Sequence, residues 1–338
     1  MAGRTREVKM DKRVLRNGLK VSVVGLGCMG FSHAYGTATE TSEAISTIRQ
    51  AFDMGCTFFD TAECYIGENA DGSTSYNEEL VGKALAPIRD QVVIATKCGV
   101  RHEGRMLVMD SRPETIRRSV EGSLKRLGTD HIDLYYQHRI DPNVPAEDVA
   151  GTMSELIWEG KILYWGISET DENYLRRAHA VCPVTAVQNR YSMMARWHEK
   201  LFPVLEELNI GYVAFSPLAN GLLSDAFSQG ERFDSADYRS AMPQYSDEAF
   251  EQNRALLQLI RELAAQKGAT PAQISLAWML GKKPYIVPIP GSRKVERIRE
   301  NLGAADVSLT TDEISAIDER LNGMEMSAVF GGSPVRKD

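Results

Sequence analysis

The chain has 338 residues, enough for one large domain or two smaller ones. With 43% hydrophobic and 25% charged residues, its composition excludes a collagen-like chain and argues against disorder or a long coiled coil. It carries 39 Lys and Arg residues against 46 Asp and Glu residues, a net charge of −7. No global positive field would therefore draw it to nucleic acid or to an anionic membrane.

Cysteine usage and hydropathy bear on the compartment. The five cysteines are scattered and form no CxxC pair, which favours free thiols in a reducing compartment over a disulfide framework or a zinc site. The charged N-terminal stretch has no apolar signal segment, and no run reaches the ~18 apolar residues that span a bilayer. We therefore expect a cytoplasmic protein with no metal ion, no membrane contact and no nucleic-acid partner.

Short apolar runs rich in β-branched and aromatic residues recur along the chain. They lie at 21–27, 56–60, 92–97, 132–138, 162–168, 184–188, 211–216 and 285–290. Each is nearly continuously apolar, as strands of a parallel sheet are when both faces of the sheet are buried. These runs predict eight strands.

Segments whose apolar residues share one helical face lie between the runs, for example at 44–52, 116–127, 149–157 and 256–264. Capping signals precede several of them: Thr41 or Ser42, Ser111 with Pro113, and Thr270 with Pro271. Eight strands alternating with helices predict a (β/α)8 barrel in a single domain over 1–338, with the barrel proper at about 20–322. A doubly wound open sheet is the alternative, which the strand count disfavours.

Three stretches interrupt the alternation. The first residues, up to about residue 20, suggest a hairpin ahead of the barrel with Asn17-Gly18 as its turn. Residues 216–245, after the seventh strand, form a long Gly-, Ser- and Asp-rich loop, and so long a loop is usually functional or disordered. The tail after Leu321 is expected to be loosely structured.

Polar residues follow the apolar runs, at the strand ends where the active sites of such barrels gather. In chain order they are Asp60, Lys97, His138, Ser168, Gln188, Ser216 after Phe215, and Gly291-Ser292-Arg293, with Tyr65 five positions after Asp60. Asp60 would provide the counter-charge that a buried Lys97 requires. Lys97 would in turn lower the pKa of the Tyr65 hydroxyl and make it a usable acid.

Six motifs in this chain resemble those of the aldo-keto reductase family. They are DTAECY (60–65), IATKCG (94–99), YYQHRID (135–141), GISE (166–169), FSPLANG (215–221) and IPGSRKVERIRENLGA (289–304). The resemblance runs from about Leu15 to Leu321, and the set is far more specific than any one motif. It implies an NADPH-dependent reductase of aldehyde and ketone carbonyls that also runs as an alcohol dehydrogenase in reverse.

The resemblance also implies catalytic roles. Tyr65 would be the general acid that protonates the carbonyl oxygen, and Lys97, paired with Asp60, would lower its pKa. His138 would orient the carbonyl of a small-molecule substrate. The hydride would come from C4 of a reduced nicotinamide.

The same resemblance implies a set of NADPH contacts. Ser168 and Gln188 would hold the carboxamide, and Phe215 would stack on the nicotinamide ring. The segment from Ser216 to Leu223 would cover the pyrophosphate. The remaining contacts would be Met29 and Asp60, Leu218 and Gly221 within the covering segment, Gly291, Ser292 and Arg293 toward the 2′-phosphate, and Arg297, Glu300 and Asn301 at the adenine end.

Two departures from the family pattern border the site. The stretch ENADGSTSY (68–76) stands where many relatives continue almost directly into NEELVGKAL, and Glu169 stands where some branches carry Asn.

Other interpretations stand beside this one. Residues 25–30 match GxGxxG, but a Rossmann glycine turn opens directly into a helix, and here a loop is expected over 31–41. Arg293, Lys294, Arg297 and Arg299 could instead form a solvated helix face, but the preceding IPGS favours a phosphate site at a helix N-terminus. Some relatives are channel-associated β subunits that bind cofactor with little turnover, so a regulatory barrel is the alternative function. The physiological substrate, the preferred direction and the oligomeric state are not predicted.

Overall fold

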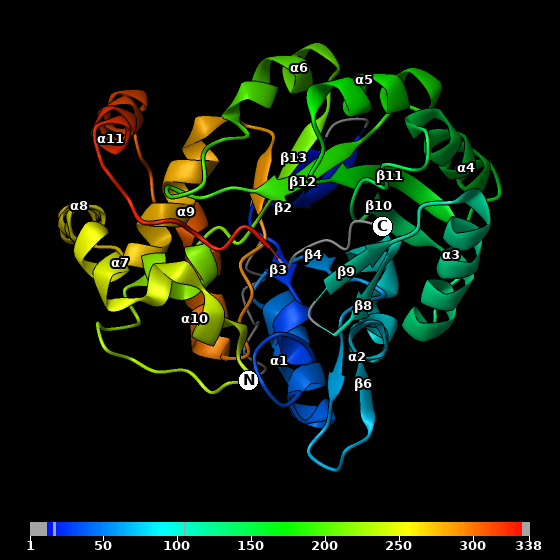
Figure 1. Ribbon diagram of the computed structural model, residues 1–338, viewed down its shortest axis with the longest axis horizontal. Coiled ribbons are helices and arrows are strands. Elements are labelled where there is room, and N and C mark those ends of the chain that lie inside the picture. The colour runs from blue at the N-terminus through cyan, green and yellow to red at the C-terminus, as the bar shows by residue number, and fades with distance from the viewer. Residues whose placement is uncertain (1–11, 16–17, 105, 333–338) are drawn as a thin grey trace, which may run out of the picture.

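Eight parallel strands form the centre of the molecule in a computed structural model that describes residues 12–15, 18–104 and 106–332 (Figure 1). They are β3 (Leu26–Gly27), β4 (Phe58–Asp60), β7 (Val93–Cys98), β10 (Ile132–Gln137), β11 (Ile162–Ser168), β12 (Ala186–Arg190), β13 (Gly211–Phe215) and β14 (Ile286–Pro288). Each pairs in parallel with the next in this order. Every predicted strand is present, and the predicted (β/α)8 barrel is confirmed.

Helices surround these strands (Figure 1). The α-helices are α1 (Thr41–Asp53), α2 (Asn77–Leu85), α3 (Pro113–Leu127), α4 (Ala146–Trp158), α5 (Glu172–Val181), α6 (Phe202–Glu207), α7 (Asp247–Gln252), α8 (Arg254–Lys267), α9 (Pro271–Lys282), α10 (Val295–Leu302) and α11 (Thr311–Asn322). Short 3₁₀ helices are η1 (Met29–Phe31), η2 (Ala86–Gln91), η3 (Glu199–Leu201) and η7 (Gly303–Asp306). The predicted apolar faces are buried, for example Ala44, Ile48 and Ala51 of α1.

The glycine-rich segment after the N-terminal hairpin closes the barrel. The Gly25 N–H donates to the Pro288 carbonyl at 2.9 Å, and the Gly27 N–H donates to that of Pro290 at 3.3 Å. A Cβ on Gly27 would lie only 2.8 Å from the Ile289 carbonyl oxygen, so a side chain there would push the two strands apart. Since α1 begins only at Thr41, the GxGxxG match belongs to barrel closure and not to a Rossmann turn.

An antiparallel hairpin of β1 (Lys12–Leu15) and β2 (Leu19–Ser22) precedes the barrel, as predicted. Leu15, Leu19 and Val21 pack into the inner core with residues such as Val213. Arg13 donates to backbone carbonyls of Leu280, Lys283 and Ile286. Of the predicted turn, Asn17 lies outside the described residues, and Gly18 has a φ of 89°.

The predicted start of the first barrel strand and the predicted cap of α1 are both wrong. Val21 and Ser22, predicted to begin the first barrel strand, belong to the hairpin, because their apolar pattern serves its antiparallel pairing with β1. The cap of α1 is Glu40, whose longer carboxylate reaches the Glu43 N–H at 3.0 Å, and Ser42 donates to Glu40 instead of capping.

Of the other two predicted caps, the one at Ser111 is wrong and the one at Thr270 is confirmed. Pro113 does begin α3, but Arg112 occupies the cap position, and the Ser111 hydroxyl instead accepts a hydrogen bond from Gln137. Thr270 caps α9 in a reciprocal capping box with Gln273, and Pro271 follows as the first helical residue, as predicted.

Additional hairpins follow two of the barrel strands. β5 (Ile66–Glu68) and β6 (Thr74–Tyr76) pair after β4, so the departure at 68–76 supplies the turn and second strand of a hairpin. β8 (Val100–Glu103) and β9 (Met106–Met109) pair after β7. Both hairpins therefore extend from the carboxyl-terminal ends of the barrel strands.

The long loop and the tail meet over the same end of the barrel. Residues 216–245 hold short 3₁₀ helices, η4 (Ala219–Ser224), η5 (Tyr238–Ala241) and η6 (Pro243–Tyr245), where the sequence predicted an irregular loop. The tail at 324–332 has no helix or strand, as expected, and runs back from α11 toward the centre of the barrel (Figure 1). The Phe330 N–H donates to the Gln244 side chain at 2.9 Å, which joins the tail to the loop.

Within the described residues, no helix is both long and apolar enough to cross a membrane.

Candidate active site

Lys97 is the centre of the candidate active site. Its Nζ lies 2.5 Å from Asp60 Oδ1, 2.7 Å from the Thr61 carbonyl oxygen and 3.2 Å from the Tyr65 hydroxyl. Lys97 is 1% exposed and Asp60 is 3% exposed, so the ion pair is buried. The predicted Lys97–Asp60 pair is therefore present, and it contacts the predicted tyrosine directly.

Strand register explains this convergence. In the pairing of β4 with β7, Asp60 lies opposite Ala95, and Lys97 stands two residues further on the same face. After Asp60 the chain turns at once, since the Tyr65 N–H donates to the Ala62 carbonyl at 3.1 Å. This turn brings the Tyr65 ring back over Lys97, whose Nζ lies 4.8 Å from the ring centroid.

The protonation states suit an acid at Tyr65. Burial raises the pKa of Tyr65 above its usual value, and the nearby Lys97 offsets part of that rise. The expected net lowering by Lys97 is thus not found, because desolvation outweighs it. Burial by itself lowers the pKa of Lys97, but its contacts with Asp60 and Tyr65 raise it above its usual value. Tyr65 is therefore neutral and Lys97 charged at neutral pH.

His138 lies beside Tyr65, with their rings edge to face at 5.8 Å between centroids. Burial, followed by the charges of Arg139 and Lys97, lowers the pKa of His138 well below its usual value, so the imidazole is neutral. Its Nδ1 lies 3.5 Å from Cys64 Sγ. Burial raises the pKa of the Cys64 thiol to about 12. A protonated thiol that donates to Nδ1 leaves the ring proton on Nε2, where it can donate to a carbonyl oxygen.

Further aromatic side chains cover Tyr65. The His33 ring stacks on it at 6.0 Å and lies 4.8 Å from the ring of His102, which comes from the β8–β9 hairpin. Tyr238, from the long loop, meets His33 edge to face at 5.6 Å. Sequence reasoning did not identify this wall, because it assembles from three separate loops.

The residues predicted to hold the nicotinamide lie on neighbouring strands. Gln188 donates from Nε2 to Asp60 Oδ2 at 2.7 Å, so it contacts the Lys97–Asp60 ion pair directly. Ser168 accepts a hydrogen bond from Arg139 at 3.0 Å. Phe215 ends β13 and is partly buried beside them. Met29 lies in η1, directly after β3 at the same end of the barrel.

The predicted pyrophosphate segment has an unusual backbone. Ser216, Ala219 and Asn220 have positive φ angles of 49°, 48° and 60°, and Gly221 has a φ of 109°. Non-glycine residues rarely adopt such angles, so this segment is held in a strained shape by its surroundings. Asn220 donates to the Tyr35 hydroxyl at 3.3 Å, and Tyr238 donates from its N–H to the Ala34 carbonyl at 2.8 Å. The predicted Leu218, at the start of η4, is buried.

The segment after β14 holds the predicted 2′-phosphate residues. Arg293 donates to the backbone carbonyls of Gly30 and, at 2.9 Å, Thr37, whereas its Nη2 is buried with no hydrogen bond among the described residues. Gly291 lies against β3, since a Cβ added at Gly291 would lie 2.8 Å from the Gly27 carbonyl oxygen. The Ser292 hydroxyl accepts from the Lys294 N–H at 3.0 Å.

The residues predicted for the adenine end lie on α10. Arg297 pairs with Glu300 at 2.7 Å, and Asn301 is buried one residue further along the helix. The alternative of a freely solvated face therefore does not describe Arg293, but it does describe the exposed Arg299.

Two arginines at the mouth were not singled out from the sequence. Arg139, directly after His138, donates to Ser168 and, at 2.6 Å, to the His138 carbonyl. Arg190 ends β12 and is only 4% exposed, yet its Nε and Nη1 have no hydrogen-bond partner among the described residues. Both follow apolar strands, and that position was the available signal.

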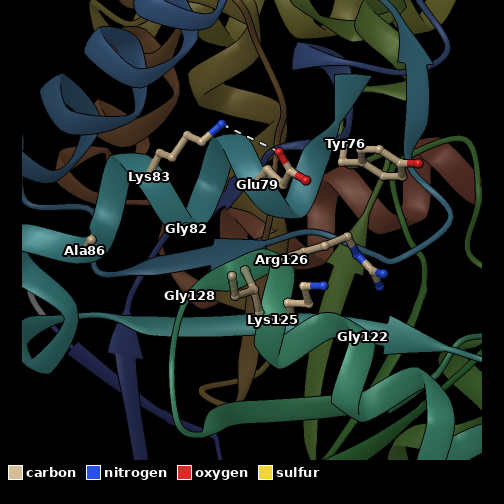
Figure 2. A pocket seen from close by; sticks show the side chains of 10 residues that line it. Tyr76, Glu79, Gly82, Lys83, Ala86, Gly122, Lys125, Arg126 and Gly128 are labelled. Carbon is tan, nitrogen blue, oxygen red and sulfur yellow. Dashed lines mark ion pairs between the residues drawn. The ribbon is translucent and has the colours of Figure 1, made fainter. Parts of the chain in front are cut away.

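A hollow of about 600 Å³ lies elsewhere, between α2 and α3 on the outside of the barrel (Figure 2). Two of its basic residues are paired, since Lys83 lies 3.5 Å from Glu79 and Arg126 lies 2.6 Å from the buried Glu78. No predicted site residue lines it. The described residues also contain no group of three or more His, Cys, Asp or Glu placed to hold a metal ion.

Comparison with known proteins identifies the family. The sequence profile described as "Aldo/keto reductase family" matches residues 23–322. A probable aldo-keto reductase 1 from Glycine max is 40% identical over 305 residues, which are 89% of this chain and 86% of the relative.

Solved structures agree with this match. The glycerol dehydrogenase AKR11B4 of Gluconobacter oxydans superposes with a TM-score of 0.81 at 29% identity, covering 92% of this chain and 95% of its own. An aldo/keto reductase from Klebsiella pneumoniae, solved in complex with NADP and acetate, gives 0.70 at 26% identity, covering 96% of this chain and 100% of its own. With the barrel, its buried Lys97–Asp60 pair and matches along most of its length, the chain belongs to the aldo/keto reductase family and is an oxidoreductase.

Proposed function

We propose that this protein reduces aldehyde and ketone carbonyls of small molecules to alcohols with NADPH, and that it catalyses the reverse oxidation. The observation that carries the proposal is the contact of the buried Lys97 Nζ with both Asp60 Oδ1 and the Tyr65 hydroxyl. This arrangement presents a neutral tyrosine beside a fixed cation. Its chemical use is to donate a proton and then to stabilise the resulting tyrosinate.

The residues present fit an NADPH molecule. Arg293 has a buried Nη2 without a hydrogen-bond partner among the described residues, and a phosphate oxygen would satisfy it. The strained turn at 216–221 holds its shape through Asn220 and Tyr245, whose hydroxyl donates to the Asn220 carbonyl at 2.9 Å. When bound, NADPH would supply a hydride to the carbonyl carbon.

The chain itself supplies the proton and the orientation. His138, neutral and with a proton on Nε2, would donate to the carbonyl oxygen and align it. Tyr65 would transfer its hydroxyl proton to the same oxygen as the carbon accepts the hydride, which completes the alcohol. Lys97 would stabilise the tyrosinate that remains, with Asp60 and Gln188 holding Lys97 in place. A proton from solvent would then restore Tyr65.

Steady-state oxidation of NADPH tests this proposal, with a panel of aldehydes, ketones, sugars and pyridoxal as substrates. General acid catalysis contributes about 10²–10⁴-fold, so Tyr65→Phe should lower turnover by that factor. Cofactor affinity, measured by fluorescence titration, should stay the same. A Tyr65→Phe enzyme with the wild-type rate would contradict the assignment. Binding of NADPH without turnover of any carbonyl by the wild-type protein would favour the regulatory alternative.

A further inference from the structure

We propose that Arg190 forms an anion subsite at the barrel mouth, so that the preferred substrates are carbonyl compounds carrying a carboxylate or phosphate group. This inference rests on the proposed function and adds a substrate class to it.

Arg190 is placed to face the mouth. In the pairing of β12 with β13 it lies opposite Phe215. Along β12, Ala186 faces the inner core and Gln188 reaches the Asp60 carboxylate, so the two-residue period of a strand puts Arg190 on the same inward face, one step nearer the mouth.

The buried Nε and Nη1 of Arg190 have no hydrogen-bond partner among the residues described, and Arg190 forms no ion pair with them, although the residue is only 4% exposed. Arg13 provides an internal contrast, because its guanidinium donates to backbone carbonyls of three residues. A guanidinium has five N–H donors, and burying it without partners costs free energy. Such a group is explained when an anionic ligand is its partner.

The carboxylate of the neighbouring Glu169 does not bind the Arg190 guanidinium. Glu169 Oε1 accepts from the Arg190 backbone N–H at 2.8 Å, and Oε2 lies 3.6 Å from His198 Nε2. Burial lowers the pKa of Arg190 to about 10, with Glu169 and Arg139 acting in opposite directions, so the guanidinium is charged at neutral pH.

Aromatic rings hold Arg190 in place without satisfying its donors. Its Cζ lies 4.9 Å from the Phe215 ring centroid and 5.8 Å from that of Phe330 in the tail. Cation–π contacts of this kind fix a guanidinium and leave its N–H groups available for hydrogen bonds.

The mouth carries surplus positive charge. Lys97 is neutralised by Asp60, but Arg139 and Arg190 share one ring, with the Arg139 Cζ 5.9 Å from the Phe215 centroid. Glu169 is the carboxylate beside these two guanidiniums. The chain as a whole has a net charge of −7, so this local positive potential opposes the global one. A substrate whose carbonyl lies at Tyr65 and His138 would direct its anionic end toward Arg190.

Matched substrate pairs test the inference. The ratio of kcat/KM for 4-carboxybenzaldehyde to that for its methyl ester should exceed one in the wild-type enzyme. In Arg190→Met, kcat/KM for the carboxylate should fall by about 10- to 150-fold, as expected for loss of a hydrogen-bonded charge contact. The value for the ester should change by less than about threefold. Arg190→Lys keeps the charge without the bidentate geometry, so its kcat/KM for the carboxylate should lie between those of the wild-type enzyme and Arg190→Met.

Controls separate the possible sources of the anion. Arg176→Gln, on α5, removes the same charge from an exposed ion pair with Glu207 of α6 and should leave the substrate ratio unchanged. Benzoate should inhibit the wild-type enzyme more strongly than Arg190→Met. Equal loss for both aldehydes would overturn the inference. A weaker NADPH affinity in Arg190→Met with an unchanged substrate ratio would also overturn it, because the anion would then be a cofactor phosphate. Either result leaves the proposed reductase intact, whereas a wild-type enzyme inactive on every carbonyl would refute the function itself.

Discussion

Lys97 and Arg190 are both buried cations at the same barrel mouth, but the protein satisfies them very differently. Lys97 has a carboxylate, a carbonyl and a tyrosine hydroxyl as partners, whereas Arg190 has no hydrogen-bond or ion-pair partner within the described ranges. Arg293 is intermediate, with two backbone carbonyls bound and Nη2 unpaired. Because an unpaired buried donor costs free energy, this series separates a cation that acts on the protein's own tyrosine from cations left available to ligands.

The largest expected effect comes from removing the satisfied cation. Lys97→Met leaves Asp60 buried without a counter-charge, which should lower the free energy of unfolding by about 3–5 kcal/mol. The same change removes the group that we propose stabilises the Tyr65 tyrosinate, so turnover should be lost. Thermal unfolding and steady-state kinetics measure the two effects. Asp60→Asn in the Lys97→Met background should recover stability but not activity, and a stable, fully active Lys97→Met enzyme would show that the pair has neither role.

The intermediate cation should affect one cofactor only. Arg293→Ala should weaken NADPH binding by about 10- to 150-fold, the range for one charge-assisted contact, and leave NADH binding almost unchanged. The preference of the wild-type protein for NADPH should shrink as salt rises, because part of the contact is screened. Fluorescence titration of both cofactors measures this.

Arg297→Ala is the matched comparison for Arg293→Ala, since Arg297 already pairs with Glu300. Its effect on the two cofactors should be similar. Equal loss of NADPH and NADH binding in Arg293→Ala would place Arg293 away from the 2′-phosphate.

The unsatisfied cation should be dispensable for folding. Arg190→Met replaces a buried charge that has no partner with an apolar side chain, so the free energy of unfolding should stay the same or rise by up to about 1–3 kcal/mol. Arg13→Met is the control, and it should destabilise because Arg13 donates to three carbonyls. Denaturant unfolding of the protein without ligand compares them. A strongly destabilised Arg190→Met would erase the contrast with Lys97.

Substitution of Cys64, the uncharged residue beside His138, should have the smallest effect on activity. Cys64→Ala removes the thiol that contacts His138 Nδ1 and should lower kcat by about 2- to 10-fold, the range for one ordinary hydrogen bond. NADPH affinity and thermal stability should hardly change. Cys64→Ser keeps a donor and should retain most of the rate. If Ala and Ser reduce kcat alike, the contact with His138 is only packing.

Local sequence determined much of this protein. Apolar runs of strand length alternate with segments of helical periodicity, and this order predicts a (β/α)8 barrel. Each helix and strand could be predicted because its pattern lies within one continuous segment. The candidate catalytic residues were also predictable, since parallel strands bring their carboxyl ends to one mouth. Asp60 and Lys97 lie at the ends of neighbouring strands, as the last and the last but one residue, and Tyr65 is five residues from Asp60. Their meeting therefore required only the correct strand order.

The tertiary structure decided what each of these side chains contacts. Val21 pairs within the hairpin because β1 is its partner there. The Cys64–His138 contact and the wall of His33, His102 and Tyr238 join segments that are remote in sequence. The lack of partners for the Arg190 guanidinium depends on Glu169, whose Oε1 accepts from the Arg190 backbone N–H and whose Oε2 lies near His198. It also depends on Phe330, which returns from the tail to pack against the guanidinium. Burial and hydrogen-bond satisfaction are properties of the packed whole, and for that reason the sequence, whose predicted strand ended at Gln188, indicated neither that Arg190 faces the mouth nor that its Nε and Nη1 lack partners.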